Sequence, residues 1–303
     1  MVAWCAFGAA LVLADPFSTW KEMYGFTTFE NETDARANFE LNFERLQQGA
    51  PTATTRSVDA TVRNGRLLYR LNRFAVVHPM DFVQRYRIDE DLMPEVSGTG
   101  DPVDVPLVDE VDWNHVVTVY DQEPCESSWL HVVVNLLEAH ETITFRRRRK
   151  ISAEYLTDCL KLDCDRGNLK LALERAFSNG YCYADEYERR GCGCARHVRI
   201  QAFDIVASDS LERVLNMGPV VAVVGLGDEF QFYSAGVLHD TCTDIDARNH
   251  ALLLTGYGVD DDGVQFWRGV GSFGPDWGEA GFFRIERNAT KCGINQEAFM
   301  ISI

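Results

Sequence analysis

Two residues that could together carry out nucleophilic chemistry, Ser128 and His250, lie 122 positions apart in this chain. A serine hydroxyl is neutral near pH 7 and attacks a carbonyl carbon only when a base removes its proton, and histidine is a common base for that step. A third group must hold the imidazole in the correct tautomer, and a hydrogen-bond donor must stabilise the oxyanion that forms. The pair therefore marks a candidate site for acyl transfer or peptide hydrolysis.

Three short motifs place these two residues in a known context. Residues 122–129 read QEPCESSW and resemble the active-site segment of papain-like proteases, roughly QGxCGSCW, with Ser128 where the nucleophilic cysteine stands. Residues 249–251, NHA, resemble the strand with the catalytic histidine, and residues 277–282, WGEAGF, resemble a signature further along. The chain resembles papain-like cysteine proteases (peptidase family C1) of the cathepsin L and mite group-1 allergen type, in precursor form.

The resemblance implies an α+β fold with two lobes. A helical lobe would hold Ser128 on its central helix, a β-barrel-like lobe would carry His250, and a helical inhibitory prodomain would precede both. The resemblance assigns Gln122 to the amide that stabilises the oxyanion. Residues 271–274 read GSFG where the family has NSWG, so Gly271 stands at the position of the orienting asparagine and Phe273 at that of the shielding tryptophan.

The replacement of the nucleophilic cysteine by Ser128 and of the orienting asparagine by Gly271 both weaken the chemistry. A papain-like cysteine is a thiolate before substrate arrives, because its surroundings lower the thiol pKa to about 3–4. Loss of the orienting residue in a serine triad costs about 10⁴ in kcat. We therefore expect a protease homologue without efficient turnover that binds peptides or proteins or acts as a decoy. The alternative is an active endopeptidase that uses Ser128 and His250 with Gln122, and a third possibility is a storage or structural protein.

The resemblance also places three residues at the substrate cleft. Gly167 matches a glycine whose backbone pairs with substrate, Arg166 is its neighbour, and Glu126 replaces a glycine near the nucleophile. A carboxylate at Glu126 would reshape the rim of the cleft. In an alternative interpretation it orients His250 in a Ser–His–Glu triad.

The region before the peptidase domain is expected to have two parts. Residues 1–14 form an apolar run that is too short to span a bilayer and is typical of a secretory signal peptide, with a buried N-terminal helix as the alternative. Residues 15–102 would be the prodomain and residues 103–303 the peptidase domain, with the boundary in the turn-rich linker 95–104. A protease that cannot cleave cannot process itself, so we expect the prodomain to stay attached unless another protease cuts that linker.

Two stretches of the expected prodomain carry the family's motifs. The first is a helical motif of spaced residues, approximated here by Glu32, Arg36, Phe39, Asn42 and Leu46. Residues 72–75, NRFA, resemble the second motif, with Val76 where an aspartate is expected.

Nine cysteines agree with an oxidising compartment, because removal of Cys5 with the signal peptide leaves eight. We expect a protein that is secreted or delivered to a lysosome or vacuole, without metal or cofactor, since no Cys-x-x-Cys pair is present. Asn31 and Asn288 begin glycosylation sequons. The resemblance suggests disulfides Cys125–Cys164 and Cys242–Cys292, a third between Cys159 and either Cys192 or Cys194, and a fourth between the remaining one of these two and Cys182.

The net charge of −17 limits the partners, because an acidic surface repels nucleic-acid phosphates. No apolar run is long enough for a membrane span. The expected partners are a peptide or protein in the cleft and the chain's own prodomain, with the protein a monomer. Residues 146–150, RRRRK, are interpreted as a solvated loop, with a trimming or polyanion-binding site as the alternative.

Periodicity predicts a helical half followed by a β-rich half. Apolar spacing predicts helices at 17–48, 128–142, 152–159 and 169–178, and strands at 67–71, 220–224, 251–255, 265–267 and 282–285.

Overall fold

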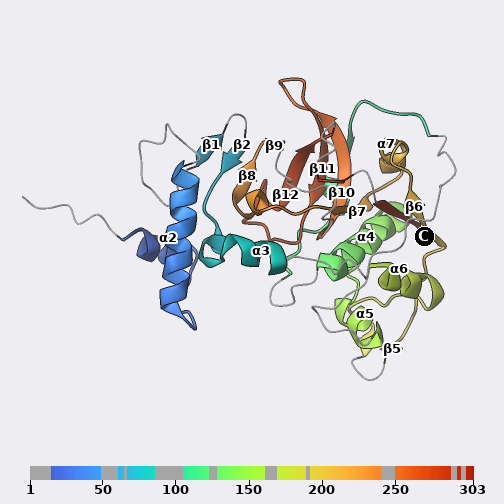
Figure 1. Ribbon diagram of the computed structural model, residues 1–303. Helices are drawn as coiled ribbons and strands as arrows, with labels where there is room; N and C mark the ends of the chain where they lie inside the picture. The colour runs from blue at the N-terminus through green and yellow to red at the C-terminus, as the bar shows by residue number, and fades with distance from the viewer. Residues whose placement is uncertain are drawn as a thin grey trace, which may run out of the picture.

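Helices lie at both ends of the molecule with β-structure between them (Figure 1). The expected signal peptide and the linker at 95–104 lie outside the residues that this computed structural model describes. The described residues are 15–48, 61–64, 67–85, 105–122, 128–160, 169–188, 192–239, 250–287, 292–294 and 298–303.

The N-terminal segment, which we define as the described residues between 15 and 85, begins with two helices, α1 (Pro16–Met23) and α2 (Glu32–Gln48). The prediction of one helix over 17–48 was wrong. The chain turns at Gly25, whose φ is +72°, a conformation that favours glycine. Asn31 then caps α2, because its Oδ1 accepts from the backbone N–H of Thr33 at 3.1 Å.

The two helices pack on each other through aromatic side chains. Phe17, Trp20 and Phe39 are at most 1% exposed and form the centre of this contact. Asn42 of α2 donates from Nδ2 to the carbonyl oxygens of Ala75 (2.9 Å) and Val77 (2.8 Å). These bonds join α2 to the later part of the N-terminal segment. The spaced motif residues Phe39 and Asn42 therefore hold this segment together.

The later part of the N-terminal segment docks on the rest of the protein. Strands β1 (Val62–Asn64) and β2 (Leu67–Tyr69) pair with β8 (Tyr233–Ala235) in one three-stranded sheet. The 3-10 helix η1 (Arg73–Val76) and the helix α3 (Pro79–Arg85) follow, and α3 packs on the 3-10 helix η4 (Asp228–Phe232). The N-terminal segment thus contributes strands and side chains to the same folded body.

The β-rich half is an eight-stranded sheet in which β10 (His250–Val259) is central. β10 pairs antiparallel with β7 (Val220–Val224), β11 (Gln265–Val270) and β3 (Val111–Asp112). The sheet continues through β12 (Phe282–Glu286) to β9 (Val237–Leu238) on one side, and through β13 (Ala298–Ser302) to β6 (Ala202–Val206) on the other. All five residues of β7 are buried, as expected for an apolar strand between two layers.

The helical half is organised around α4 (Ser128–Phe145), whose apolar side chains are buried almost all round. α4 packs against β10 and against α6 (Leu169–Ser178) and α5 (Ala153–Leu160). Shorter elements complete the fold: η3 (Asn114–Val116), β4 (Tyr187–Glu188), β5 (Gly193–Cys194) and α7 (Leu211–Leu215). None of the helices in the described part of the chain is both long and apolar enough to cross a membrane.

Two disulfides fasten the edge of the helical half. Cys159, in α5, is bonded to Cys192, and Cys182 is bonded to Cys194 in β5. Of the two alternatives that the sequence leaves open for Cys159, the structure has the one with Cys192. The molecule is thus an α+β protein with a helical half and a β-rich half, as expected.

Candidate active site

Ser128 is the first residue of α4 and its side chain is buried, with 2% exposed. Its Oγ makes no hydrogen bond to any residue that the structure describes. The N-terminus of a helix carries partial positive charge, which stabilises an anion there. This positive charge would lower the pKa of a thiol at this position, but a serine hydroxyl stays neutral and needs a base.

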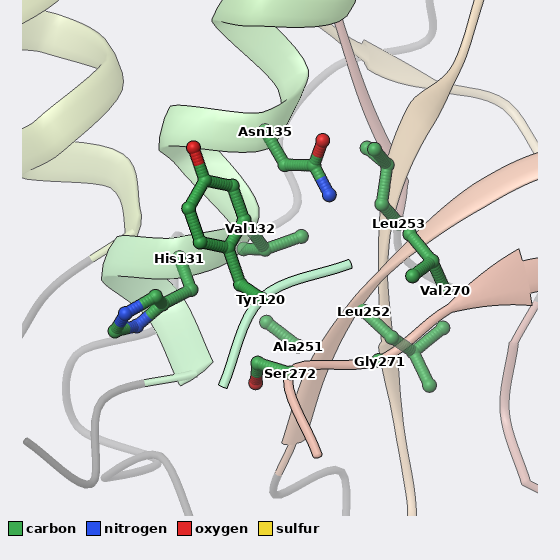
Figure 2. Close-up of a pocket in the computed structure, with 10 residues that line it drawn as sticks. All are labelled: Tyr120, His131, Val132, Asn135, Ala251, Leu252, Leu253, Val270, Gly271 and Ser272. Carbon is green, nitrogen blue, oxygen red and sulfur yellow. The ribbon is translucent and has the colours of Figure 1, made fainter. Parts of the chain in front are cut away.

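His250 begins β10 opposite Val224 of β7, and its side chain is fully buried. The first turn of α4 and the first residues of β10 line one small cavity (Figure 2), so the elements that begin with Ser128 and His250 meet at these ends. The imidazole lies flat against the ring of Phe273, with 5.3 Å between ring centroids and 15° between planes. The candidate base therefore has an aromatic neighbour on one face.

Gln122 is 1% exposed and is held from two directions by Ser272. Its backbone N–H donates to the carbonyl oxygen of Ser272 at 3.0 Å, and the Ser272 hydroxyl donates to its Oε1. Its Nε2 has no hydrogen-bond partner among the described residues. An amide that is fixed through its oxygen and has N–H groups to spare is suited to stabilise an oxyanion.

The surroundings of Gly271 explain why no orienting side chain fits there. A Cβ placed on Gly271 would lie 2.6 Å from Cδ2 and 2.8 Å from Cε2 of Phe273, closer than real Cβ contacts come. The Phe273 ring is 1% exposed and also contacts Trp277, with 4.5 Å between centroids. The aromatic ring thus takes the space that a side chain at position 271 would need.

The cavity beside these residues has a polar lining that the sequence analysis did not identify. Tyr120, His131, Asn135 and Ser272 contribute polar side chains to it (Figure 2). His131 lies one turn after Ser128 on α4, and its ring is 5.6 Å from that of Tyr120. The i, i+3 spacing of Ser128 and His131 was the only signal in the sequence for this placement.

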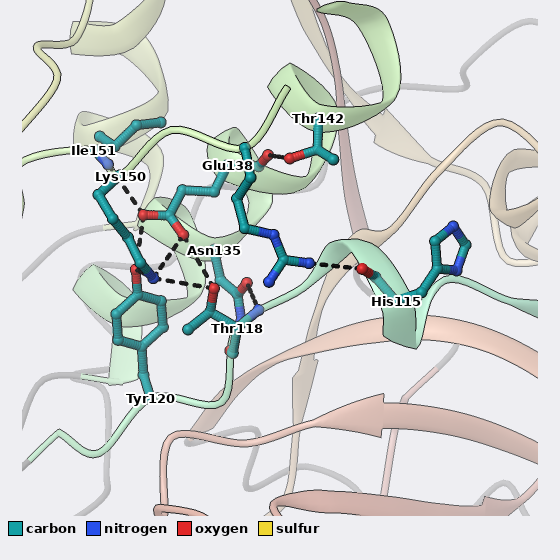
Figure 3. A network of polar contacts seen from close by, with 9 residues as sticks. His115, Thr118, Tyr120, Asn135, Glu138, Thr142, Lys150 and Ile151 are labelled. Atoms are coloured by element: carbon teal, nitrogen blue, oxygen red, sulfur yellow. Dashed lines mark hydrogen bonds and ion pairs between the residues drawn. The ribbon is translucent and has the colours of Figure 1, made fainter. Parts of the chain in front are cut away.

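A network around the buried Glu138 fixes the extended segment that leads to Gln122 (Figure 3). The carboxylate accepts from the Tyr120 hydroxyl at 2.7 Å, the Ile151 backbone N–H at 3.0 Å and the Lys150 ammonium at 3.2 Å. Burial, with Glu138 as the next cause, raises the pKa of Tyr120 well above its ordinary value, so the phenol stays protonated and donates. α4 thereby positions residues 118–122 as well as Ser128.

The basic run at 146–150 is largely bound to the protein itself. Arg149 pairs with Asp185 at 2.5 Å and Glu186 at 3.1 Å, and its guanidinium lies 3.5 Å from the centroid of the Tyr183 ring. Lys150 belongs to the Glu138 network. Part of this run therefore stabilises the fold, and the solvated-loop interpretation was incomplete.

The remaining expected site residues divide into two groups. Asn31 is exposed at the start of α2, and Cys292 is disulfide-bonded. Among the described residues, no three His, Cys, Asp or Glu side chains are grouped as a metal site requires. Seven expected residues lie outside the described residues: Glu126, Arg166, Gly167, Cys125, Cys164, Cys242 and Asn288.

Comparison with known proteins shows the family of this chain. Residues 107–302 match the family described as papain family cysteine protease. The chain is 31% identical over 304 residues to "Thiol protease aleurain-like" of Arabidopsis thaliana, covering 92% of this chain and 81% of the relative. It is 28% identical over 264 residues to "Viral cathepsin" of Adoxophyes honmai nucleopolyhedrovirus, covering 77% of each.

Among solved structures, digestive procathepsin L 3 of Tenebrio molitor larval midgut superposes with a TM-score of 0.76 at 25% identity, covering 95% of this chain and 98% of the other. The chain therefore belongs to the papain family of cysteine proteases. Its α+β fold is the papain-like fold, and its structural neighbours include proenzymes.

Proposed function

We propose that this protein is a papain-family protease homologue without efficient peptide-bond cleavage, which acts by binding peptides or proteins or as a decoy. The observation that carries the proposal is the position of the Phe273 ring against Gly271, beside the buried His250. With this ring in place, residue 271 supplies no group to orient the imidazole. The family's orienting group is therefore absent at position 271, and loss of the orienting residue in a serine triad lowers kcat by about 10⁴.

The identity of Ser128 supports the same conclusion. A thiolate–imidazolium pair is charged before substrate binds, whereas Ser128 must be deprotonated during the attack itself. That step depends on the orientation of His250 more strongly than thiolate chemistry does. Ser128 and Gly271 thus each weaken the reaction, and their combined effect is not the product of two separate losses because they act in one unit.

We further propose that the N-terminal segment is a prodomain that remains in place. Asn72 donates from Nδ2 to the carbonyl oxygen of Gln231 at 2.7 Å, and Gln231 donates from Nε2 to the carbonyl oxygens of Phe74 (2.9 Å) and Val77 (2.8 Å). These groups are buried among apolar side chains, so undocking would exchange the hydrogen bonds for bonds to water and would expose that apolar surface. The similar solved structures include a procathepsin L and a cysteine protease in its proform, which supports the role of this segment as a prodomain.

The route through the secretory pathway is part of the proposal. Two disulfides support an oxidising compartment, either outside the cell or in a lysosome or vacuole. Residues 1–14 would be the signal peptide, and Asn31 and Asn288 the glycosylation sites. Treatment of purified protein with an endoglycosidase, followed by mass measurement, tests the last point.

The decisive experiment is hydrolysis of a fluorogenic peptide library from pH 4 to 8 after removal of the N-terminal segment by an added protease. A Ser128→Ala variant is the matched control. We expect equal rates for the two proteins. Activity that is lost in the variant would instead establish a working hydrolase.

One observation favours that alternative, a weak serine-type endopeptidase with Ser128, His250 and Gln122. The Nε2 of Gln122 remains available as an oxyanion donor. This alternative predicts labelling of Ser128 by a fluorophosphonate and no reaction at the site with thiol-directed epoxides. Absence of labelling would remove it.

A further inference from the structure

The Phe273 ring lies between the candidate site and the N-terminal segment. On the site side it stacks on His250. On the other side it contacts Phe82 of α3, with 5.8 Å between centroids and 26° between planes, and Phe74 of η1, with 6.4 Å and an edge-on angle of 82°. Phe74, Phe82 and Phe273 are each at most 1% exposed.

A polar contact fixes the backbone of the same residue. Arg73 donates from Nη2 to the Phe273 carbonyl oxygen at 3.0 Å, and its two Nη groups pair with both carboxylate oxygens of Asp121. Asp121 precedes Gln122 and forms a β-bridge with Phe273. Bidentate pairs of this kind fix direction as well as distance. The N-terminal segment therefore holds Phe273 by its ring and by its backbone.

The missing side chain at Gly271 permits this arrangement. The Cδ2 and Cε2 atoms of Phe273 occupy the position next to the Gly271 Cα, so any larger residue at 271 would displace the ring. The ring would then leave His250, Phe82 or both. Gly271 and Phe273 form a matched pair, because the position of the Phe273 ring requires a glycine at 271.

We propose that Phe273 is a positioning residue that couples the N-terminal segment to His250, so that docking of residues 73–85 and burial of the imidazole are one linked state. The partner of this aromatic face is the chain's own segment with Phe74 and Phe82. The coupling does not require that the protein cleave peptide bonds or fail to do so. It therefore goes beyond the proposed function and can be tested independently of it.

The test measures how fast diethylpyrocarbonate modifies His250 in the full chain, by peptide mass spectrometry. Phe82→Ala is compared with Phe39→Ala, a matched control that removes an equally buried ring from the N-terminal segment without touching Phe273. Because reactivity follows the population of locally opened molecules, we expect His250 to react about tenfold faster in Phe82→Ala than in Phe39→Ala. All variants carry Ser128→Ala, so hydrolysis plays no part in the result.

The reverse direction follows from linkage, since two coupled events affect each other equally. Phe273→Ala should speed hydrogen exchange in residues 73–85 and leave residues 32–36, at the start of α2 and before its contacts with residues 75–77, unchanged. Should Phe82→Ala fail to fold, Phe82→Leu keeps most of the volume and removes the ring contact, with a smaller effect in the same direction. Equal His250 reactivity in the Phe82 and Phe39 variants, or unchanged exchange in residues 73–85, would overturn the coupling.

Discussion

The two ends of the candidate site are held in different ways. At one end, Gln122 is fixed by hydrogen bonds to Ser272, and the segment before it is fixed by the Glu138 network. At the other end, His250 is packed against Phe273, in the space beside Gly271. The polar end is held by hydrogen bonds to side chain and backbone, whereas the aromatic end is held by ring packing against a glycine.

The difference has a structural reason. The hydrogen bonds at Gln122 also join residues 120–122 to residues 272–274, so losing them would loosen the body of the protein. At the other end the Phe273 ring fills the space beside Gly271 and is buried, so the contact with His250 is apolar.

The largest effect is expected from rebuilding the aromatic end. Ser128→Cys alone should gain a reactive thiol but little hydrolysis. Adding Gly271→Asn and Phe273→Trp together should raise kcat further, by less than the factor of about 10⁴ that an orienting residue contributes in a serine triad, because a thiolate depends less on the orientation of His250. Peptide hydrolysis after removal of the N-terminal segment measures this, with Ser128→Ala in the same background as the blank. Equal rates with and without the two added changes would show that Gly271 is not the limiting loss.

The polar end is tested by Glu138→Ala. The change leaves the Tyr120 hydroxyl, the Ile151 N–H and part of Lys150 without an acceptor, so we expect a loss of about 2–4 kcal/mol in the free energy of unfolding. Urea denaturation measures it. Glu40→Ala, an exposed carboxylate on α2, is the control and should change stability by less than about 0.5 kcal/mol. A loss no greater than the control's would mean that the network does not support this end.

Gly271→Asn alone should destabilise the protein, because its Cβ would come within 2.6 Å of the Phe273 ring. Overpacking of this kind costs about 1–3 kcal/mol. Gly263→Asn is the control: nothing lies within 4 Å of its added Cβ, and asparagine tolerates its φ of +82°. The double variant Gly271→Asn/Phe273→Ala should lose less stability than the sum of the two single losses, because the asparagine has room once the ring is removed. Simple addition of the two single losses would refute the matched pair.

The sequence predicted the elements better than their junctions. The helix at 169–178 agrees with α6 at both ends, and four predicted strands lie within β7, β10, β11 and β12. The strand predicted at 67–71 overlaps β2, which ends at Tyr69. The sequence analysis did not predict β6 and β13, which pair with each other from positions about a hundred residues apart. Local apolar spacing carries little information about such long-range pairing.

The candidate site was predictable in part for the same reason. Motif order indicated Ser128, His250 and Gln122, and it indicated that Gly271 and Phe273 depart from the family. It did not indicate that these two departures fit each other, since that depends on where a ring points. Nor did it indicate Arg73, which reaches Phe273 from 200 positions away. Side-chain direction and long-range docking arise only when the chain is folded.

The smallest effect is expected from removing a single serine hydroxyl, either at Ser272, which bonds to Gln122, or at Ser128. Ser272→Ala removes the hydroxyl that donates to Gln122 Oε1 and should cost about 1–2 kcal/mol of unfolding free energy, because a buried acceptor loses its donor. Ser128→Ala removes a buried hydroxyl with no hydrogen bond to any described residue, so the change should stay within about 0.5 kcal/mol or slightly stabilise the protein. Both are measured in one urea series. If Ser128→Ala costs as much as Ser272→Ala, the Ser128 hydroxyl contributes to the stability of the fold. The difference drawn here between the two serines would then be wrong.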